Sequence, residues 1–83
     1  MATLRPPLLK VISKAYEANA MVALKFGRYD ISLKTDDSGR PILLFIGKRQ
    51  SDGTIKGDRY ARRLLFDASG KAIKDHWDYK GKT

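Results

Sequence analysis

The segment from Arg28 to Ile42 reads RYDISLKTDDSGRPI, and the segment from Arg59 to Ile73 reads RYARRLLFDASGKAI. Aligned without a gap, both begin with Arg-Tyr, carry Asp-x-Ser-Gly followed by a basic residue, and end with isoleucine. A strand, a glycine turn and a second strand are typical of a β-hairpin. The match therefore predicts two hairpins of one design, produced either by duplication or by the turn chemistry that any two hairpins share.

A helix is expected ahead of these hairpins, over about residues 6–18. Pro6 and Pro7 have the fixed φ that suits a first helical turn. From Leu8 to Tyr16, apolar side chains recur at helical spacing and polar side chains fall on the opposite stripe. After Asn19 the period changes to two, which indicates strands.

Five strands are predicted from this alternation and from four turns, at Gly27-Arg28, Asp36–Gly39, Ser51–Thr54 and Asp67–Gly70. The strand Ile42–Ile46 is apolar on both faces, so it is expected to be central, with the helix across one face. Gly57 is a candidate β-bulge.

The predicted fold class is α+β, with an N-terminal helix packed on a five-stranded antiparallel β-meander. Residues 1–83 are expected to form a single small domain with frayed ends at about residues 1–5 and 80–83.

The composition is strongly basic. Seventeen Lys and Arg against nine Asp and Glu give a formal net charge of +8, and such a domain attracts polyanions. There is no cysteine, hence no disulfide framework, which fits a reducing cytoplasm. Lys10 interrupts the apolar stretch that a secretion signal needs, and the run Ile42–Ile46 is far shorter than a membrane span. We expect a cytoplasmic protein with no membrane partner.

The densest positive stretch predicts a nucleic-acid-binding surface, formed by Lys48, Arg49, Lys56, Arg59, Arg62 and Arg63, with Tyr60 as a stacking ring. Guanidinium groups hold phosphates while an aromatic ring stacks on a base, which suits RNA or single-stranded DNA. Strand alternation divides the set, because Tyr60 and Arg62 share one face while Arg59 and Arg63 share the other. The alternative is a solvated strand whose charges prevent self-association.

The C-terminal segment contains the single histidine and the single tryptophan of the chain. Trp77 and Tyr79 lie on one side of the predicted strand, as an aromatic platform for a base or as packing that closes the core. His76 and Asp78 supply fewer ligands than a zinc site needs, so no metal is predicted. No glycine loop opens a helix and a lone histidine leaves a triad incomplete, so we expect neither an enzyme nor a cofactor.

The chain resembles, in the stretches Gly57–Tyr60, Asp67–Lys71, Ile73–Asp78 and Lys80–Lys82, small uncharacterised bacterial proteins of similar length that share a KDHWDxKGK-like C-terminus. The resemblance covers roughly the second half of the chain. It implies a bacterial, stand-alone domain and assigns no functional residue.

Two functions remain as hypotheses. The first is a non-enzymatic module that binds RNA or single-stranded DNA through its basic sheet surface. The second is a protein–protein interaction or scaffold domain, in which apolar residues near Trp77 or on the helix dock a protein partner or a second copy of the chain.

Overall fold

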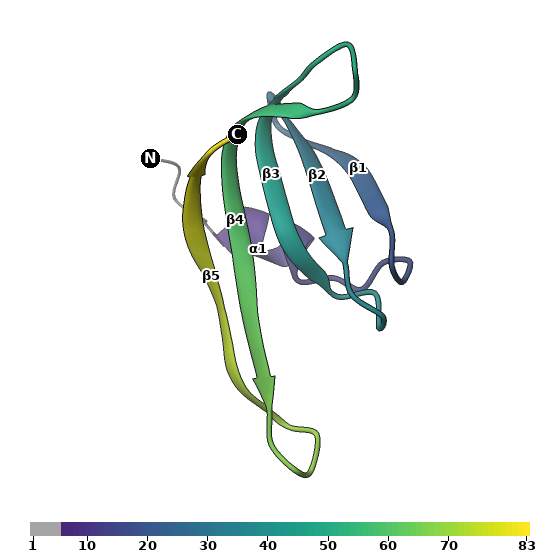
Figure 1. The fold of residues 1–83 in the computed structure, drawn as a ribbon, viewed down its shortest axis with the longest axis vertical. Coiled ribbons are helices and arrows are strands. Elements are labelled where there is room, and N and C mark those ends of the chain that lie inside the picture. The colour runs from purple at the N-terminus through teal and green to yellow at the C-terminus, as the bar shows by residue number, and fades with distance from the viewer. Residues whose placement is uncertain (1–5) are drawn as a thin grey trace.

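The computed structural model describes residues 6–83 as one short helix followed by a five-stranded antiparallel sheet. The elements are α1 (Pro6–Ile12), β1 (Met21–Phe26), β2 (Tyr29–Thr35), β3 (Pro41–Arg49), β4 (Ile55–Phe66) and β5 (Ala72–Lys82). Each strand pairs with the next in the order β1-β2-β3-β4-β5 (Figure 1). The predicted helix and five-stranded antiparallel meander are confirmed at this level. The fraying expected for residues 1–5 lies outside the described residues.

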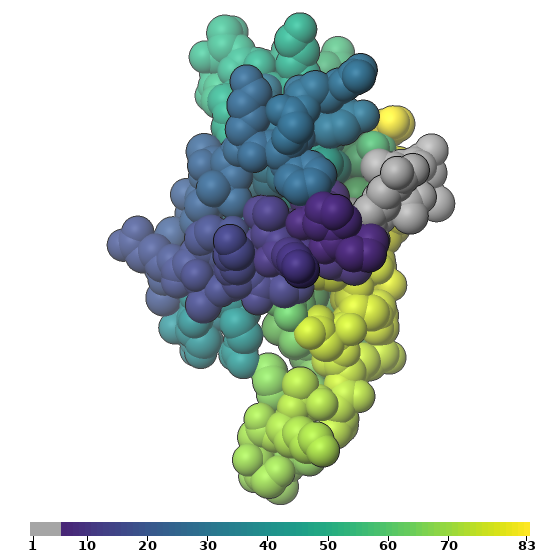
Figure 2. Space-filling view, turned by 180° about the vertical axis from the view of Figure 1, so that it is seen from behind, coloured from purple at the N-terminus to yellow at the C-terminus, as the bar shows by residue number. Residues whose placement is uncertain are grey.

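Helix α1 lies on one face of the sheet and not on the other. Helix α1 lies behind the sheet in Figure 1 and crosses the middle of the molecule in the reverse view of Figure 2. Leu8 and Ile12 of α1 are buried and belong to the same hydrophobic cluster as Ile31 and Leu44 of the sheet. No described helix covers the other face, which is turned toward the viewer in Figure 1 and is called the open face below.

Cross-strand pairs build the core on the helix side of the sheet. Ile31 of β2 lies opposite Ile46 of β3, and Leu33 lies opposite Leu44, which in turn faces Tyr60 of β4. Burial of each such side chain contributes about 1.5–3 kcal/mol relative to exposure in water. The central position predicted for the strand Ile42–Ile46 is confirmed, because β3 has a neighbour on each side.

Helix α1 is shorter than predicted, because contacts with the β2–β3 turn draw the following segment out of helical geometry. The Tyr16 amide donates to the carbonyl oxygen of Gly39 at 2.8 Å, and the Asn19 amide donates to Asp36 O at 2.8 Å. Asn19 has a left-handed φ of 52° and leads into β1. Tertiary hydrogen bonds thus override the helical pattern of residues 13–18.

The two matching hairpins have the same turn chemistry. Asp36 Oδ1 accepts hydrogen bonds from the amides of Ser38 and Arg40, both at 2.9 Å. At the corresponding place, Asp67 Oδ1 accepts from the Ser69 and Lys71 amides, again both at 2.9 Å. The glycine of each turn has a positive φ, 80° and 86°, a conformation that glycine adopts at no steric cost.

A close approach of two backbones bends the β3–β4 hairpin. Gly47 and Gly57 are directly opposite, and a Cβ on either would lie 2.2–2.3 Å from a carbonyl oxygen of the facing strand. Gly57 therefore pairs in register instead of forming the predicted bulge. In Figure 1 the first residues of β4 run across the top of β3 before the strand turns down the sheet.

The C-terminal residues 80–83, expected to fray, are held against β4. Lys82 is still part of β5, and the Thr83 amide donates to Gly57 O at 3.0 Å. The Thr83 hydroxyl donates to Ile55 O at 2.7 Å and accepts from the Gly57 amide. The hydrogen-bond partners of the C-terminal residues are thus in the bent part of β4, and the sequence alone did not reveal them.

Replacing Gly47 with Ala should destabilise the fold by about 1–3 kcal/mol, because the new methyl group meets backbone atoms that have no room to move. Urea unfolding followed by circular dichroism measures the loss, and Ser51→Ala in the exposed turn is the matched control. A Gly47→Ala protein as stable as the control would show that the close approach is not required.

Candidate nucleic-acid interface

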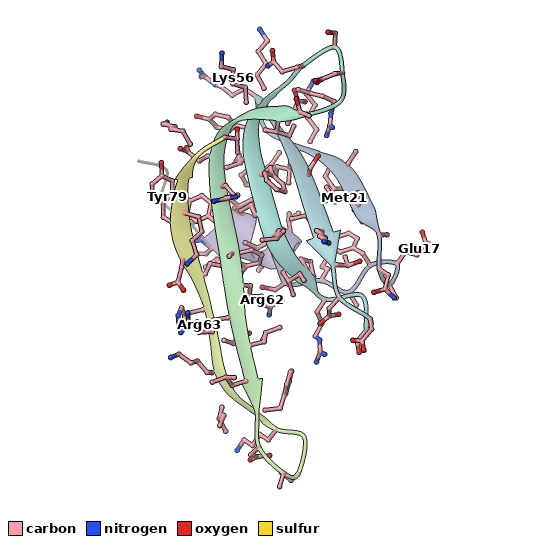
Figure 3. All side chains as sticks on the ribbon, in the orientation of Figure 1. Glu17, Met21, Lys56, Arg62, Arg63 and Tyr79 are labelled. Atoms are coloured by element: carbon pink, nitrogen blue, oxygen red, sulfur yellow. The ribbon has the colours of Figure 1, made fainter. Side chains whose placement is uncertain are left out.

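The predicted cations fall on both faces of the sheet, as the alternation along β4 indicated. Arg59 and Arg63 flank Ala61 on the open face, whereas Arg62 lies on the helix side with the core residue Tyr60. In Figure 3, Arg63 lies on the lower part of β4, which extends beyond β3, and Lys56 lies at the upper end of β4. The predicted set therefore does not form one surface.

Tyr60 does not have the exposed ring that a stacking role requires. Its side chain belongs to the core cluster and is only 3% exposed. Its ring packs edge-on against Tyr79, with centroids 5.3 Å apart, and burial raises the pKa of its hydroxyl. Tyr60 stabilises the fold, and we remove it from the candidate site.

Arg62 is already neutralised within the protein. Its guanidinium forms a two-pronged ion pair with Asp75, at 2.7 Å from Nε and 2.8 Å from Nη2, and also donates to Pro41 O. The side chain is 8% exposed and lies over the Trp77 ring. Hydrogen bonding from Arg62 lowers the pKa of Asp75, so the pair stays charged at neutral pH. Arg62 has little capacity left for a phosphate.

Arg49 is likewise engaged in the fold. Its amide donates to Asp30 Oδ2, and its guanidinium donates to Gly53 O at 2.8 Å and to Ile31 O at 3.0 Å. These contacts tie the β3–β4 turn to β2. Arg49 thus secures the bent end of the hairpin.

Lys48 and Lys56 are exposed and face each other across β3 and β4. Strand alternation directs both away from the open face, beyond the bend at Gly47. They are accessible to an anion but are separated from Arg59 and Arg63, so the structure does not bring them together with those arginines.

The C-terminal aromatic pair packs against the protein instead of offering a clear platform. Trp77 is partly buried against the core, in agreement with its alternative role of closing the core. The Tyr79 hydroxyl donates to Asp58 Oδ1 at 3.0 Å, and the same oxygen lies 3.0 Å from Lys82 Nζ. On the other side of β5, His76 Nε2 lies 3.2 Å from Asp78 Oδ1.

The open face offers a different combination of cations with one ring. Four exposed cations of this face, called the open-face cations below, are Lys34, Arg59, Arg63 and Lys74. Phe45 lies between Ser32 and Arg59 in the register of β2, β3 and β4, and it is only partly buried. Among residues 6–83, no carboxylate forms an ion pair with any of these four cations. Arg59 and Arg63 are four residues apart, or about 13 Å along the strand.

Phe45 and Lys34 were not predicted as site residues, because both lie outside the densest run of positive charge. Strand alternation could have predicted that Phe45 lies on the opposite face of the sheet from Leu44. The strand register then places Phe45 beside Arg59. Without the register, the contribution of β2 to this surface was not accessible.

Comparisons with protein family models, with curated proteins and with solved structures find no match to this chain. In the described part of the chain, no helix has the length and apolar character needed to cross a membrane. Residues 6–83 also contain no group of three His, Cys, Asp or Glu side chains placed to hold a metal ion.

The Asp58 contacts predict a loss of stability in acid. The Lys82 ammonium, and after it the Tyr79 hydroxyl, lower the pKa of Asp58 by more than desolvation raises it. A lowered folded-state pKa gives stability that is present above the unfolded pKa and lost as pH falls through the folded value. Urea midpoints should therefore fall more steeply below about pH 4 for the native protein than for Asp58→Asn.

The matched control for this measurement is Asp37→Asn in an exposed turn, which should follow the native protein. Equal acid sensitivity of the native and Asp58→Asn proteins would mean that the contacts of Asp58 add nothing to stability.

Proposed function

We propose that this protein is a non-enzymatic module that binds single-stranded RNA or DNA on the open face of its sheet. The observation that carries the proposal is the position of Phe45 opposite Arg59, among cations that form no ion pair with a described carboxylate. Arginine and lysine hold phosphates in such sites, and a ring stacks on bases of any sequence. The absence of cysteine accords with the cytoplasmic location that we propose, and the basic charge accords with a polyanionic partner, whereas the proposed bacterial origin rests on the resemblance described above.

The open face suits an extended strand better than a duplex. Beyond the Gly47–Gly57 pair, the turn of the β3–β4 hairpin and Phe45 together line a hollow on this face. A strand with splayed bases can bring one base to Phe45, whereas paired bases in a helix present only their edges. The cations supply affinity, and the ring favours unpaired nucleotides.

Binding should depend on salt and on the open-face cations. If the four cations each neutralise one phosphate, affinity for a single strand should fall about fiftyfold between 50 and 200 mM salt. The double variant Arg59→Ala/Arg63→Ala should reduce the slope of log affinity against log salt by about 1.4. Fluorescence anisotropy with labelled single-stranded RNA and DNA measures both effects.

The matched control is Lys10→Ala/Lys14→Ala, which removes the same charge from exposed positions in and after α1. It should retain the slope of the native protein. Absence of binding at low salt, or equal losses in the two double variants, would overturn an open-face site.

A protein-interaction role is supported by one specific observation, the apolar end of the β4–β5 hairpin. Leu65, Phe66 and Ile73 are 50%, 41% and 64% exposed, and this hairpin extends beyond the rest of the sheet in Figure 1. Exposed apolar clusters of this kind mark interaction sites in soluble proteins. The occupant would be a protein partner or a second copy of the chain.

Light scattering in 0.5 M salt tests self-association through this hairpin end, since high salt suppresses polyanion binding without weakening apolar contacts. Under the nucleic-acid hypothesis the protein is a monomer. A dimer that is lost in Ile73→Lys but kept in the control Ala68→Lys would favour the interaction domain instead.

A further inference from the structure

The open face contains a hollow at its upper end, formed by the bend of the β3–β4 hairpin. The cavity has a volume of about 320 Å³ and is lined by Met21, Ser32, Phe45, Ile55 and Thr83 with the turn residues Gly53 and Thr54. Residues from β1, β2 and β3 form one side, and the bent hairpin with the C-terminal residue forms the other. This volume is at the lower end of the range for small-molecule sites, so it suits one small ring system.

The hollow is held in shape by hydrogen bonds within the protein. Arg49 links Gly53 O in the turn to Ile31 O in β2, which fixes the turn relative to the sheet. Thr83 joins the other wall, because its hydroxyl donates to Ile55 O and accepts from the Gly57 amide. A cavity whose walls are tied in this way is largely formed before a ligand arrives, which reduces the ordering cost of binding.

The lining has the chemistry of a base-binding site. Phe45, Met21 and Ile55 supply an aromatic ring and flexible or branched apolar contacts for a flat ligand. The Ser32 side chain borders the hollow. A hydroxyl donates and accepts, so it can pair with the edge of any nucleobase.

The cations near the hollow indicate which kind of ligand it would bind. Arg59 lies directly opposite Phe45 in the register of β3 and β4, and Lys34 follows two residues after Ser32 on β2. A mainly apolar hollow with two cations next to its lining residues Phe45 and Ser32 matches a ligand with a flat ring and an adjoining negative group. A nucleotide within a strand has both, with its phosphate at the position of the arginine.

We propose that this hollow receives one unpaired nucleobase, whose ring packs on Phe45 while its phosphate meets Arg59. This inference rests on the proposed function and deepens it, since it specifies an unstacked base as the recognised feature. A base paired within a duplex cannot enter, so the site selects single strands, loops and bulges over continuous duplexes.

The test compares a single-stranded DNA with an oligonucleotide of the same length and charge in which all bases are replaced by abasic sites. The native protein should bind the base-containing strand about tenfold more tightly in anisotropy titrations at one fixed salt concentration. Phe45→Leu keeps an apolar side chain and should lose this preference while binding the abasic strand as the native protein does. Leu65→Ala, on the same face but outside the hollow, is the control and should keep the preference.

The outcomes separate this inference from the function on which it rests. Equal binding of both strands by the native protein, with the loss in Arg59→Ala/Arg63→Ala retained, would overturn the base site and leave the phosphate surface intact. No binding of either strand would overturn both. Tighter binding of a duplex than of the single strand would overturn the unpaired-base requirement.

A methyl signal locates the base independently of any substitution. The chain has two methionines, and Met21 borders the hollow. In protein labelled with carbon-13 at the methionine methyl groups, the Met21 signal should shift when the base-containing strand is added and should stay in place with the abasic strand. Saturating binding of the base-containing strand without a Met21 shift would place the base elsewhere.

Discussion

The backbones of Gly47 and Gly57 approach so closely that neither position has room for a side chain, and this contact bends the β3–β4 hairpin. The bend carries the turn that contains Gly53 over the open face, where Phe45 becomes part of a concave wall. Strand alternation, and not the bend, places Lys48 and Lys56 on the other face of the hairpin from Arg59. The backbone contact thus determines where the open face is hollow.

The two hairpins with matching sequences have the same turn chemistry but different surroundings. In the first hairpin, Thr35 is 2% exposed, and its hydroxyl donates to Glu17 O and accepts from the Ala20 amide. Phe66 occupies the corresponding position of the second hairpin and is 41% exposed, with the Arg40 guanidinium over its ring. The segment after α1 covers the first turn, and no described segment covers the second. This asymmetry leaves the apolar hairpin end as the surface best suited to a protein contact.

Sequence patterns predicted the parts of the fold that depend on local chemistry. Two-residue alternation gave the strands, and the Asp-x-Ser-Gly turns follow from aspartate oxygens that accept nearby amides. Patterns failed where distant contacts decide the outcome. The helix ends early because Tyr16 bonds to the β2–β3 turn, and the contacts of Thr83 with β4 were not visible in the sequence. Gly57 was recognised as special, but its partner Gly47 could be identified only from the register.

The positions of the candidate residues were only partly predictable from the sequence. Parity correctly placed Arg59 and Arg63 on one face, but it did not show that Asp75 neutralises Arg62 or that Tyr60 fills the core. Charge density in the sequence therefore overstated the role of paired arginines and overlooked Lys34, which joins the surface from another strand. An unpaired cation next to an aromatic ring is therefore a better indicator of a candidate site than a high local density of charge.

The most direct test of the open-face site is a nuclear magnetic resonance titration of the uniformly nitrogen-15-labelled protein with a single-stranded oligonucleotide at low salt. Amide shifts concentrated on β2, β3 and β4 around Lys34, Phe45 and Arg59, with α1 unchanged, are the predicted result. Shifts that are concentrated on α1 or at the β4–β5 turn, while the open face stays unchanged, would contradict it.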